Sequence, residues 1–397
     1  MSWEYKTLDQ LGEVSRGRSK HRPRNDPSLF GGKYPFIQTA DVKAANFYIT
    51  EYDTTYNEKG LAQSRLWNPG TLCITIAANI ADTGILAMDA CFPDSVMGFL
   101  PYEGIADVRF VKYCFDILQQ NCKKISQGAA QDNLSWEKLS TILFPAPPIE
   151  VQTKIADILS TYDNLIENNK KQIKLLEEAA QRLYKEWFVD LRFPGHENVK
   201  IVDGVPEGWR TVKLSDVANV NKACISERYP YDYVDYVDLG SVSRGHIEAI
   251  ARILVQGAPS RAKRLAFDGD IIWGMVRPNL KSYALVLHPS ETSVYSTGFA
   301  VLSAQKVPFS FLYCCVTQDD FVSYLVNCTN GAAYPAVKPD HFREAAITLP
   351  TDSLLRQFNL IAEPMYRKIE ILEKQIKRSK EARDRLLPKL MNREIEV

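Results

Sequence analysis

Basic side chains gather near the N-terminus in a stretch without apolar periodicity, which predicts an exposed loop. The cations of this stretch are Arg16, Arg18, Lys20, Arg22 and Arg24. A loop of this kind can neutralise DNA phosphates or follow a groove. The other interpretation is a solvated loop, because short basic runs are common.

A second group of candidates lies in the C-terminal half. Arg277-Pro278-Asn279-Leu280-Lys281 follows a strand-like run, Ile271 to Met275. Arg and Asn are the side chains that pair bidentately with guanine and adenine edges. The other cations and polar residues predicted to contact DNA in this half are Arg244, Arg261, Lys263, Arg264, Tyr334 and Lys338.

Polar residues of the N-terminal half complete the predicted DNA contacts. They are Gln38, Asn79, Gln127, Gln131 and Asn133, in expected loops or at expected strand ends. Taken one at a time, each is better explained as a turn or cap residue than as a base reader.

No catalytic constellation accompanies these candidates. The sequence has no GxxxxGK[ST], no GxGxxG after a strand, no HExxH and no GxSxG. The 5 histidines are scattered, and the 8 cysteines show no CxxC spacing. A binding protein with reduced thiols and no metal or cofactor of its own is therefore expected.

One long helix, from Ile149 to Trp187, separates the two groups of candidates. Its seam alternates steps of four and three, the coiled-coil period. The helix-packing residues of this seam are Ile155, Leu159, Ile166, Ile173, Leu176 and Leu183. Asn169 also falls on the seam, where it either fixes the register or marks a solvated kink.

A second copy of this seam runs from Phe358 to Leu390. Ile166-Glu167 aligns with Ile369-Glu370, in the same heptad phase. The packing residues of the second copy are Ile369, Leu372, Ile376 and Leu386. Ser379 and Arg383 interrupt the seam, and Pro364 predicts a kink or a late start. Two matching seams predict that the helices pack on each other.

The chain has 397 residues and a formal net charge of zero, so each half can form its own core. Both halves share landmarks: Val212–Val220 resembles Thr7–Val14, and Asp268–Ile271 resembles Pro69–Leu72. We expect a short helix within Trp3–Val14, strands at Tyr34–Gln38, Thr71–Ala77 and Gly84–Met88, and a helix at Asp107–Gln120. The expected order is a globular domain (1–148), a helix (149–190), a connector (191–206), a second domain (207–350) and a helix (351–397). The most apolar run, Thr71–Phe92, is interrupted by Asn79, Asp82 and Gly84 and is too polar to span a membrane. With no signal peptide, the 8 cysteines are expected to be reduced thiols of a cytoplasmic protein.

Three stretches resemble a known family. Pro147-Pro148-Ile149-Glu150 opens the first helix, Leu183-Tyr184-Lys185-Glu186-Trp187 closes it, and Val205-Pro206-Glu207-Gly208-Trp209 opens the second domain. Together with the doubled arrangement, they resemble the specificity subunit of Type I restriction-modification enzymes over essentially the whole chain. The second helix departs from the pattern, because it lacks the Pro-Pro and Glu of the first.

The resemblance implies an α+β fold in which two similar, mixed α/β target recognition domains are held apart by an antiparallel coiled coil. Each domain would read one half of a bipartite double-stranded DNA site, and the helices would set the gap. The subunit itself would be non-catalytic and would serve DNA methylation and phage defence. It would recruit two modification subunits, which use S-adenosylmethionine, and through them restriction subunits that use ATP and Mg.

Two alternatives come from other functional classes. One is a coiled-coil structural adaptor that joins two protein-binding modules without nucleic acid. The other is an enzyme, such as the recognition half of a single-chain restriction-methylation protein, and the missing methyltransferase motifs count against it. Salt-dependent binding to duplex DNA separates the specificity subunit from the adaptor.

Overall fold

The computed structural model describes residues 3–76, 82–125, 136–202, 204–226, 228–329 and 335–397. The chain forms two compact units, one of residues 1–170 with 374–397 and the other of residues 171–373. The helices α6 (Ile149–Tyr184) and α10 (Asp352–Met391) contribute to both units. Five predicted DNA-contact residues lie outside the described residues: Asn79, Gln127, Gln131, Asn133 and Tyr334.

A five-stranded sheet forms the centre of the first unit, in the order β2-β8-β6-β7-β4. Its strands are β2 (Gly12–Arg16), β4 (Tyr48–Ile49), β6 (Leu72–Thr75), β7 (Thr83–Leu86) and β8 (Val96–Pro101). Two smaller pairings are β1 (Glu4–Lys6) with β9 (Phe144–Ala146) and β3 (Phe30–Pro35) with β5 (Thr55–Tyr56). Its other helices are α1 (Leu8–Leu11), α2 (Thr39–Ala44), α3 (Glu58–Ala62), α4 (Val108–Ile125) and α5 (Trp136–Leu139).

The core of the first unit joins this sheet to the long helices. Phe99 from the sheet and Phe110 from α4 belong to the same buried cluster as Leu159 of α6 and Leu390 of α10. In this unit the two helices run antiparallel, because Asn169 Nδ2 donates to Gln375 Oε1 at 3.2 Å and Asp163 pairs with Arg383. Asn169 is buried and contacts the partner helix. This placement agrees with the register-fixing role and not with a solvated kink.

Two four-stranded sheets build the second unit, in the orders β13-β20-β17-β18 and β15-β14-β19-β16. The strands of the first are β13 (Ala218–Val220), β17 (Ile271–Gly274), β18 (Tyr283–Leu285) and β20 (Phe299–Ala304). Those of the second are β14 (Tyr233–Val237), β15 (Ala251–Leu254), β16 (Ala262–Arg264) and β19 (Ser293–Ser296). The pairs β10 (Ile201–Val202) with β11 (Val205–Pro206) and β12 (Arg210–Lys213) with β21 (Ala346–Leu349) complete its strands. Its shorter helices are α7 (Phe309–Thr317), α8 (Asp319–Asn327) and α9 (Pro339–Glu344).

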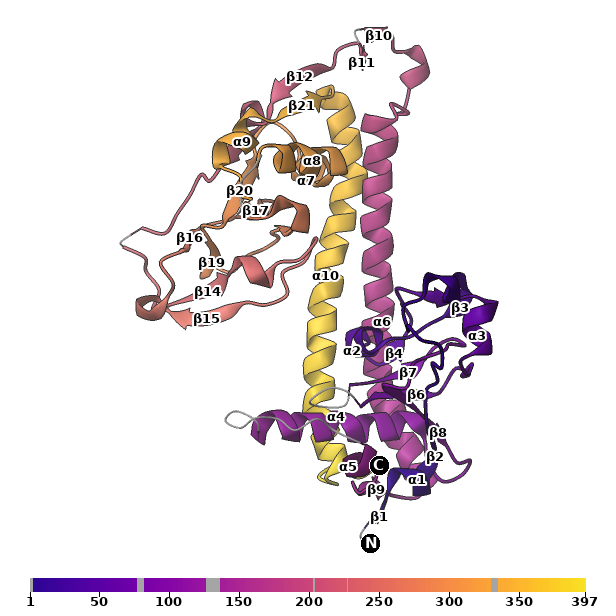
Figure 1. Ribbon diagram of the computed structural model, residues 1–397. Coiled ribbons are helices and arrows are strands. Elements are labelled where there is room, and N and C mark those ends of the chain that lie inside the picture. Colours follow the sequence, from indigo (N-terminus) through magenta and orange to yellow (C-terminus); the bar gives the residue numbers. More distant parts are fainter. Residues whose placement is uncertain (1–2, 77–81, 126–135, 203, 227, 330–334) are drawn as a thin grey trace. The chain divides into compact units, whose positions relative to one another are not determined.

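The long helices pack against each other in the second unit as well (Figure 1). Phe358 of α10 lies 6.2 Å from Tyr184 of α6 and 5.1 Å from Phe188, between ring centroids. The π-helical turn Lys185–Val189 follows α6 directly. The late start predicted at Pro364 is wrong, since α10 is one helix from Asp352 to Met391. The alternative, a kink at Pro364, stays a prediction. Pro364 lies on the exposed face, where water can hydrate the carbonyl that its ring leaves without a partner.

The predicted packing residues differ in burial. Ile155, Leu159, Ile166, Ile173, Ile369 and Leu372 are buried, whereas Leu176, Leu183, Ile376 and Leu386 are half-buried. Leu387 is buried instead of Leu386, and Ser379 is buried within the seam that it was expected to interrupt.

Both units repeat one local pattern. In the first, α1 lies between β1 and β2; in the second, the 3-10 turn Leu214–Asp216 lies between β12 and β13. The turns before β6 and β17 also match, because Gly70 N donates to Leu86 O and Gly269 N donates to Val286 O, each at 2.9 Å. The predicted fold class is confirmed: mixed α/β units with an internal repeat and two long helices packed antiparallel.

The two turn glycines provide a matched pair of substitutions. Both have positive φ, +85° at Gly70 and +81° at Gly269, which side chains other than glycine adopt at a cost. A Cβ on Gly70 would meet nothing within 4 Å, whereas one on Gly269 would lie 3.2 Å from Phe309. We expect Gly70→Ala to lower the free energy of unfolding by about 1 kcal/mol and Gly269→Ala by about 2 kcal/mol. Urea titrations measure both, and equal losses would contradict the added steric cost at Gly269.

Some predicted elements are wrong in detail. The short helix expected within Trp3–Val14 is present as α1, but Val14 lies in strand β2, because β1 pairs with β9 and β2 pairs with β8. Pairing with distant strands overrides the local apolar spacing. Arg16 consequently ends β2 rather than opening a loop. The strand expected at Tyr34–Gln38 is displaced, since β3 ends at Pro35. Among the described residues, no helix has the length and apolar character needed to cross a bilayer.

Candidate DNA-recognition interface

The basic loop of the first unit continues from β2, an edge strand of the five-stranded sheet. Arg16, Arg18 and Lys20 are exposed and form no ion pair with the described residues. Arg22 and Arg24 differ, because both approach Asp94, with Arg24 Nη2 2.7 Å and Arg22 Nη2 3.9 Å from Asp94 Oδ2. Arg22 also donates to the backbone oxygen of Ser19 at 2.6 Å. The loop therefore has three cations available to a partner and two that hold its own shape.

One basic residue beside this loop gave little signal in the sequence. Arg65 lies 3.8 Å above the ring of Trp67, a cation–π arrangement, and donates to Ser15 Oγ at 2.9 Å. Ser15 belongs to β2 and directly precedes Arg16. Arg65 belongs to no sequence motif. Only the fold shows that it lies against the edge strand β2.

Gln38 has a structural role in the first unit. Its backbone N–H donates to Asp41 Oδ2 at 2.6 Å at the start of α2, and its side chain donates to Thr54. Gln38 is therefore the residue at the start of α2, a role that the sequence analysis also gave as an explanation.

The second unit presents residues 277–281 as the turn of the hairpin between β17 and β18. Arg277 and Asn279 are exposed. Lys281 Nζ lies 2.6 Å from Asp319 Oδ1, and this hydrogen bond lowers the pKa of Asp319. Arg244 belongs to the same group, since a hydrogen bond with Tyr283 raises its pKa. The structure thus brings Arg244, Arg277, Asn279 and Lys281 to one hairpin and its surroundings.

The remaining predicted residues of the second unit lie on other elements. Arg261 and Lys263 are exposed at β16, an edge strand, and Arg264 donates to Cys224 Sγ at 3.4 Å. Lys338 is exposed just before α9. It follows a segment that pairs with the start of the hairpin, because Val337 N donates to Met275 O at 2.8 Å.

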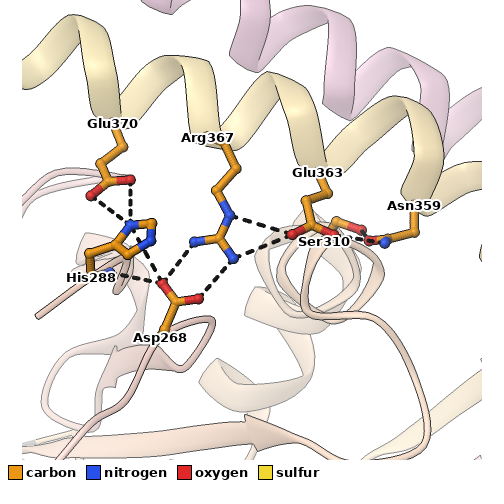
Figure 2. Close-up of polar contacts among 7 residues, drawn as sticks. All are labelled: Asp268, His288, Ser310, Asn359, Glu363, Arg367 and Glu370. Atoms are coloured by element: carbon orange, nitrogen blue, oxygen red, sulfur yellow. Dashed lines mark hydrogen bonds and ion pairs between the residues drawn. The ribbon is translucent and has the colours of Figure 1, made fainter.

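In the second unit, polar contacts connect the turn before β17 to α10 (Figure 2). Arg367 donates two hydrogen bonds to Asp268, at 2.7 and 2.8 Å, and they lower the pKa of Asp268 to about 2. His288 Nδ1 lies 2.9 Å from Glu370 Oε2, and its backbone N–H donates to Asp268. Asp268 directly precedes the turn glycine before β17, so these contacts hold the base of the hairpin strand against the helix.

A second histidine contacts both long helices in this unit. His246 Nδ1 lies 3.0 Å from Glu373 Oε1 of α10, and Nε2 lies 3.7 Å from Glu177 Oε1 of α6. The hydrogen bond with Glu373 raises the pKa of His246, burial opposes this rise, and the charges of Glu177 and Glu248 add to it. Burial raises the pKa of Glu177, whereas His246 and Arg244 lower it.

This arrangement predicts a dependence of stability on pH. Because the pKa of folded His246 lies above its ordinary value of 6.5, its contribution is complete below about pH 6.5. The contribution is lost as the pH rises through the higher, folded-state pKa. The melting temperature of the wild type should therefore fall more steeply between pH 6.5 and 8.5 than that of His246→Gln. Parallel curves for the two proteins would show that His246 does not bind its proton more tightly in the folded state.

The described residues contain no group of three or more His, Cys, Asp or Glu side chains placed to hold a metal ion. The basic loop of the first unit and the 277–281 hairpin of the second expose cations, an amide and backbone turns. Such groups can bind phosphate and base edges.

Comparison with known proteins agrees with this geometry. Residues 1–178 match the family described as Type I restriction modification DNA specificity domain. The Type I restriction enzyme MjaIX specificity subunit of Methanocaldococcus jannaschii is 26% identical over 410 residues, which cover 100% of this chain and 94% of that protein. The Type I restriction enzyme HindI specificity subunit of Haemophilus influenzae is 22% identical, covering 97% and 98%.

A solved structure has the same fold. The crystal structure of the S subunit of a Type I restriction-modification system from M. genitalium superimposes with a TM-score of 0.62 at 14% identity, covering 98% of this chain and 96% of that one. The sequence matches and this shared fold extend over both units. Over its whole length the chain is therefore similar to Type I restriction enzyme specificity subunits, and residues 1–178 match the model of their DNA specificity domain.

Proposed function

We propose that this chain selects the DNA sequence for a Type I restriction-modification complex, and that each unit reads one half of a bipartite site. The observation that carries the proposal is the repeated pattern. The turns at Gly70 and Gly269 make the same backbone hydrogen bond in the two units. In the second unit this turn is followed by β17 and by the exposed polar hairpin turn at 277–281. The first unit adds the free cations Arg16, Arg18 and Lys20. The similarity of the whole chain to Type I specificity subunits supports this role and not the protein-joining adaptor.

In this proposal α6 and α10 set the gap between the half-sites. Helices of 36 and 40 residues have lengths of about 54 and 60 Å at about 1.5 Å per residue. These lengths exceed one turn of DNA, about 34 Å, so rods of this size suit a spacer between two readers. The proposed reading units are residues 1–148 and 207–350.

We further propose that the long helices bind two modification subunits. Exposed apolar side chains support this: Leu175 of α6 is 65% exposed and Leu360 of α10 is 76% exposed. On α10 the next residue, Ile361, is also 42% exposed, and contiguous apolar groups left in water commonly mark a protein interface. The modification subunits would use S-adenosylmethionine and would carry restriction subunits that use ATP and Mg. The subunit itself is not the catalyst, and the assembly would act in the cytoplasm.

Salt-dependent DNA binding tests the proposal. We expect the combined Arg16→Ala, Arg18→Ala and Lys20→Ala variant, assembled with its modification subunits, to bind cognate duplex more weakly. The slope of log K against log salt should fall by about 2–3, since each phosphate contact contributes about 0.9. Arg24→Ala is the matched control, because Asp94 already holds that guanidinium, and it should change the slope by less than 1.

Two results would count against the proposal. An unchanged slope in the triple variant would remove the basic loop from the phosphate backbone. A wild-type complex whose binding to duplex DNA is absent or insensitive to salt would contradict the DNA-reading role itself.

A further inference from the structure

We infer that the tip of the β17–β18 hairpin reads adenine–thymine pairs in the major groove, with Asn279 on adenine and Leu280 on a thymine methyl group. The inference rests on the proposed function and names the bases that one surface of the second unit recognises. It is argued from the rigidity of the hairpin, from its backbone conformation and from the chemistry of its tip.

The hairpin is anchored in the core on both sides of its turn. Trp273 is opposite Tyr283 in the last ladder pair, both are buried, and Trp273 Nε1 donates to Val316 O at 3.1 Å. Pro278 is buried beneath the tip. Arg277 N donates to Pro335 O at 2.8 Å, which ties the turn to the neighbouring segment. A reader built this way is already ordered before DNA binds, and little entropy is lost on binding.

The turn uses a backbone conformation that favours glycine, yet two basic residues adopt it. Arg277 has φ of 50° and Lys281 has φ of 55°, one on each side of the 3-10 turn Pro278–Leu280. Glycine would adopt these angles without strain. Strained non-glycine residues persist where the surrounding structure holds them, often at binding sites. The two left-handed residues reverse the chain sharply and leave Asn279 and Leu280 as the exposed tip.

The chemistry of the tip differs from that of its base. At the base of the tip, Lys281 Nζ lies 2.6 Å from Asp319 Oδ1, so this cation has a partner within the unit. The tip itself has an exposed amide and a leucine that is 59% exposed. In the major groove, an asparagine amide pairs bidentately with N6 and N7 of adenine, and the C5 methyl of thymine is the apolar feature. An amide beside an apolar side chain therefore matches an A·T pair better than a G·C pair.

Duplexes with single altered bases test the inference on the complete complex. The cognate site comes from mapping the adenines that the complex methylates. Each thymine is then replaced in turn by deoxyuridine, which removes only the methyl group, and each adenine by 7-deazaadenine, which removes only N7. For the wild type we expect one thymine at which the methyl loss weakens binding about fourfold and one adenine at which N7 loss weakens it about tenfold.

The variants then assign these contacts to residues. Leu280→Ala should bind the thymine and deoxyuridine duplexes equally at that position, and Asn279→Ala should lose the sensitivity to 7-deazaadenine. Leu254→Ala, which truncates a leucine 67% exposed on β15, should keep both discriminations. All three positions are exposed, so the variants should melt close to the wild type.

The inference is overturned if Leu280→Ala keeps the wild-type discrimination at every thymine, or if no thymine methyl matters to the wild type. In either case the complex still binds its bipartite site, and the proposed function stands. A wild-type complex that prefers no bipartite duplex would instead overturn the proposed function.

Discussion

Asp163→Ala should lower the free energy of unfolding of the first unit by about 3–5 kcal/mol, because it removes one partner of a buried ion pair. Asp163 is fully buried in α6, where it pairs with Arg383 of α10 and accepts hydrogen bonds from Tyr113 Oη at 2.6 Å and Asn46 Nδ2 at 3.1 Å. Burial and the neighbouring charge of Asp163 raise the pKa of Tyr113, so its phenol stays protonated and donates. The substitution leaves the guanidinium of Arg383, only 17% exposed, without this partner.

Two other variants make the Asp163 experiment specific. Asp157→Ala, on the same helix, removes a carboxylate that is 61% exposed and pairs with Arg109, and it should cost less than about 1 kcal/mol. Asp163→Asn keeps the size and part of the hydrogen bonding and should fall between the two. Urea unfolding followed by circular dichroism measures all three. A loss below 1 kcal/mol for Asp163→Ala would show that Arg383 finds another partner or water.

Lengthening both long helices by one heptad should lengthen the gap in the DNA site by about three base pairs. Seven residues add about 10 Å of helix, and DNA rises about 3.4 Å per base pair. One insertion follows Lys170 and the other precedes Lys374, where α6 and α10 pass between the two units. A whole heptad keeps the phase of the seam. Binding to the original site should weaken by at least about a hundredfold, because one half-site is then out of register with its reader.

The matched control inserts the same seven residues after Gly104, in an exposed turn of the first unit. This insertion should leave the preferred gap unchanged. Binding of each complex to duplexes whose gap changes one base pair at a time gives the result. If the helix insertions weaken binding but leave the preferred gap unchanged, the helices do not act as a spacer.

The long helices could be predicted from the sequence because their period of 3.5 residues repeats over many turns. The seam also identified Asn169 as a position facing the partner helix, and Gln375 is the residue it contacts. The pairing of Arg383 with Asp163 could not be predicted from the seam. A charged residue on an apolar seam reads as an interruption until its partner is known, and Asp163 lies next to the seam position Tyr162 in the sequence.

The candidate site was less predictable, because its geometry depends on distant contacts. Arg22 and Arg24 belong to the same basic run as Arg16, but Asp94, far along the chain, engages only those two. A loop at 277–281 could be predicted because these residues follow the strand-like run Ile271 to Met275, and its arginine and asparagine made it a candidate for base contacts. Its left-handed residues could not be predicted, since nothing in the residue types requires φ to be positive there. Likewise, the sequence did not predict that Arg65 packs on Trp67 and lies against the edge strand β2.

Mapping methylated adenines in genomic DNA treated with the assembled complex tests the central claim most directly. The account predicts one motif made of two short sequences separated by a gap of fixed length and unspecified sequence. Exchange of residues 207–350 for the matching segment of a relative should change one of the two sequences and preserve the other and the gap. A single uninterrupted motif, or modification without sequence preference, would contradict the account.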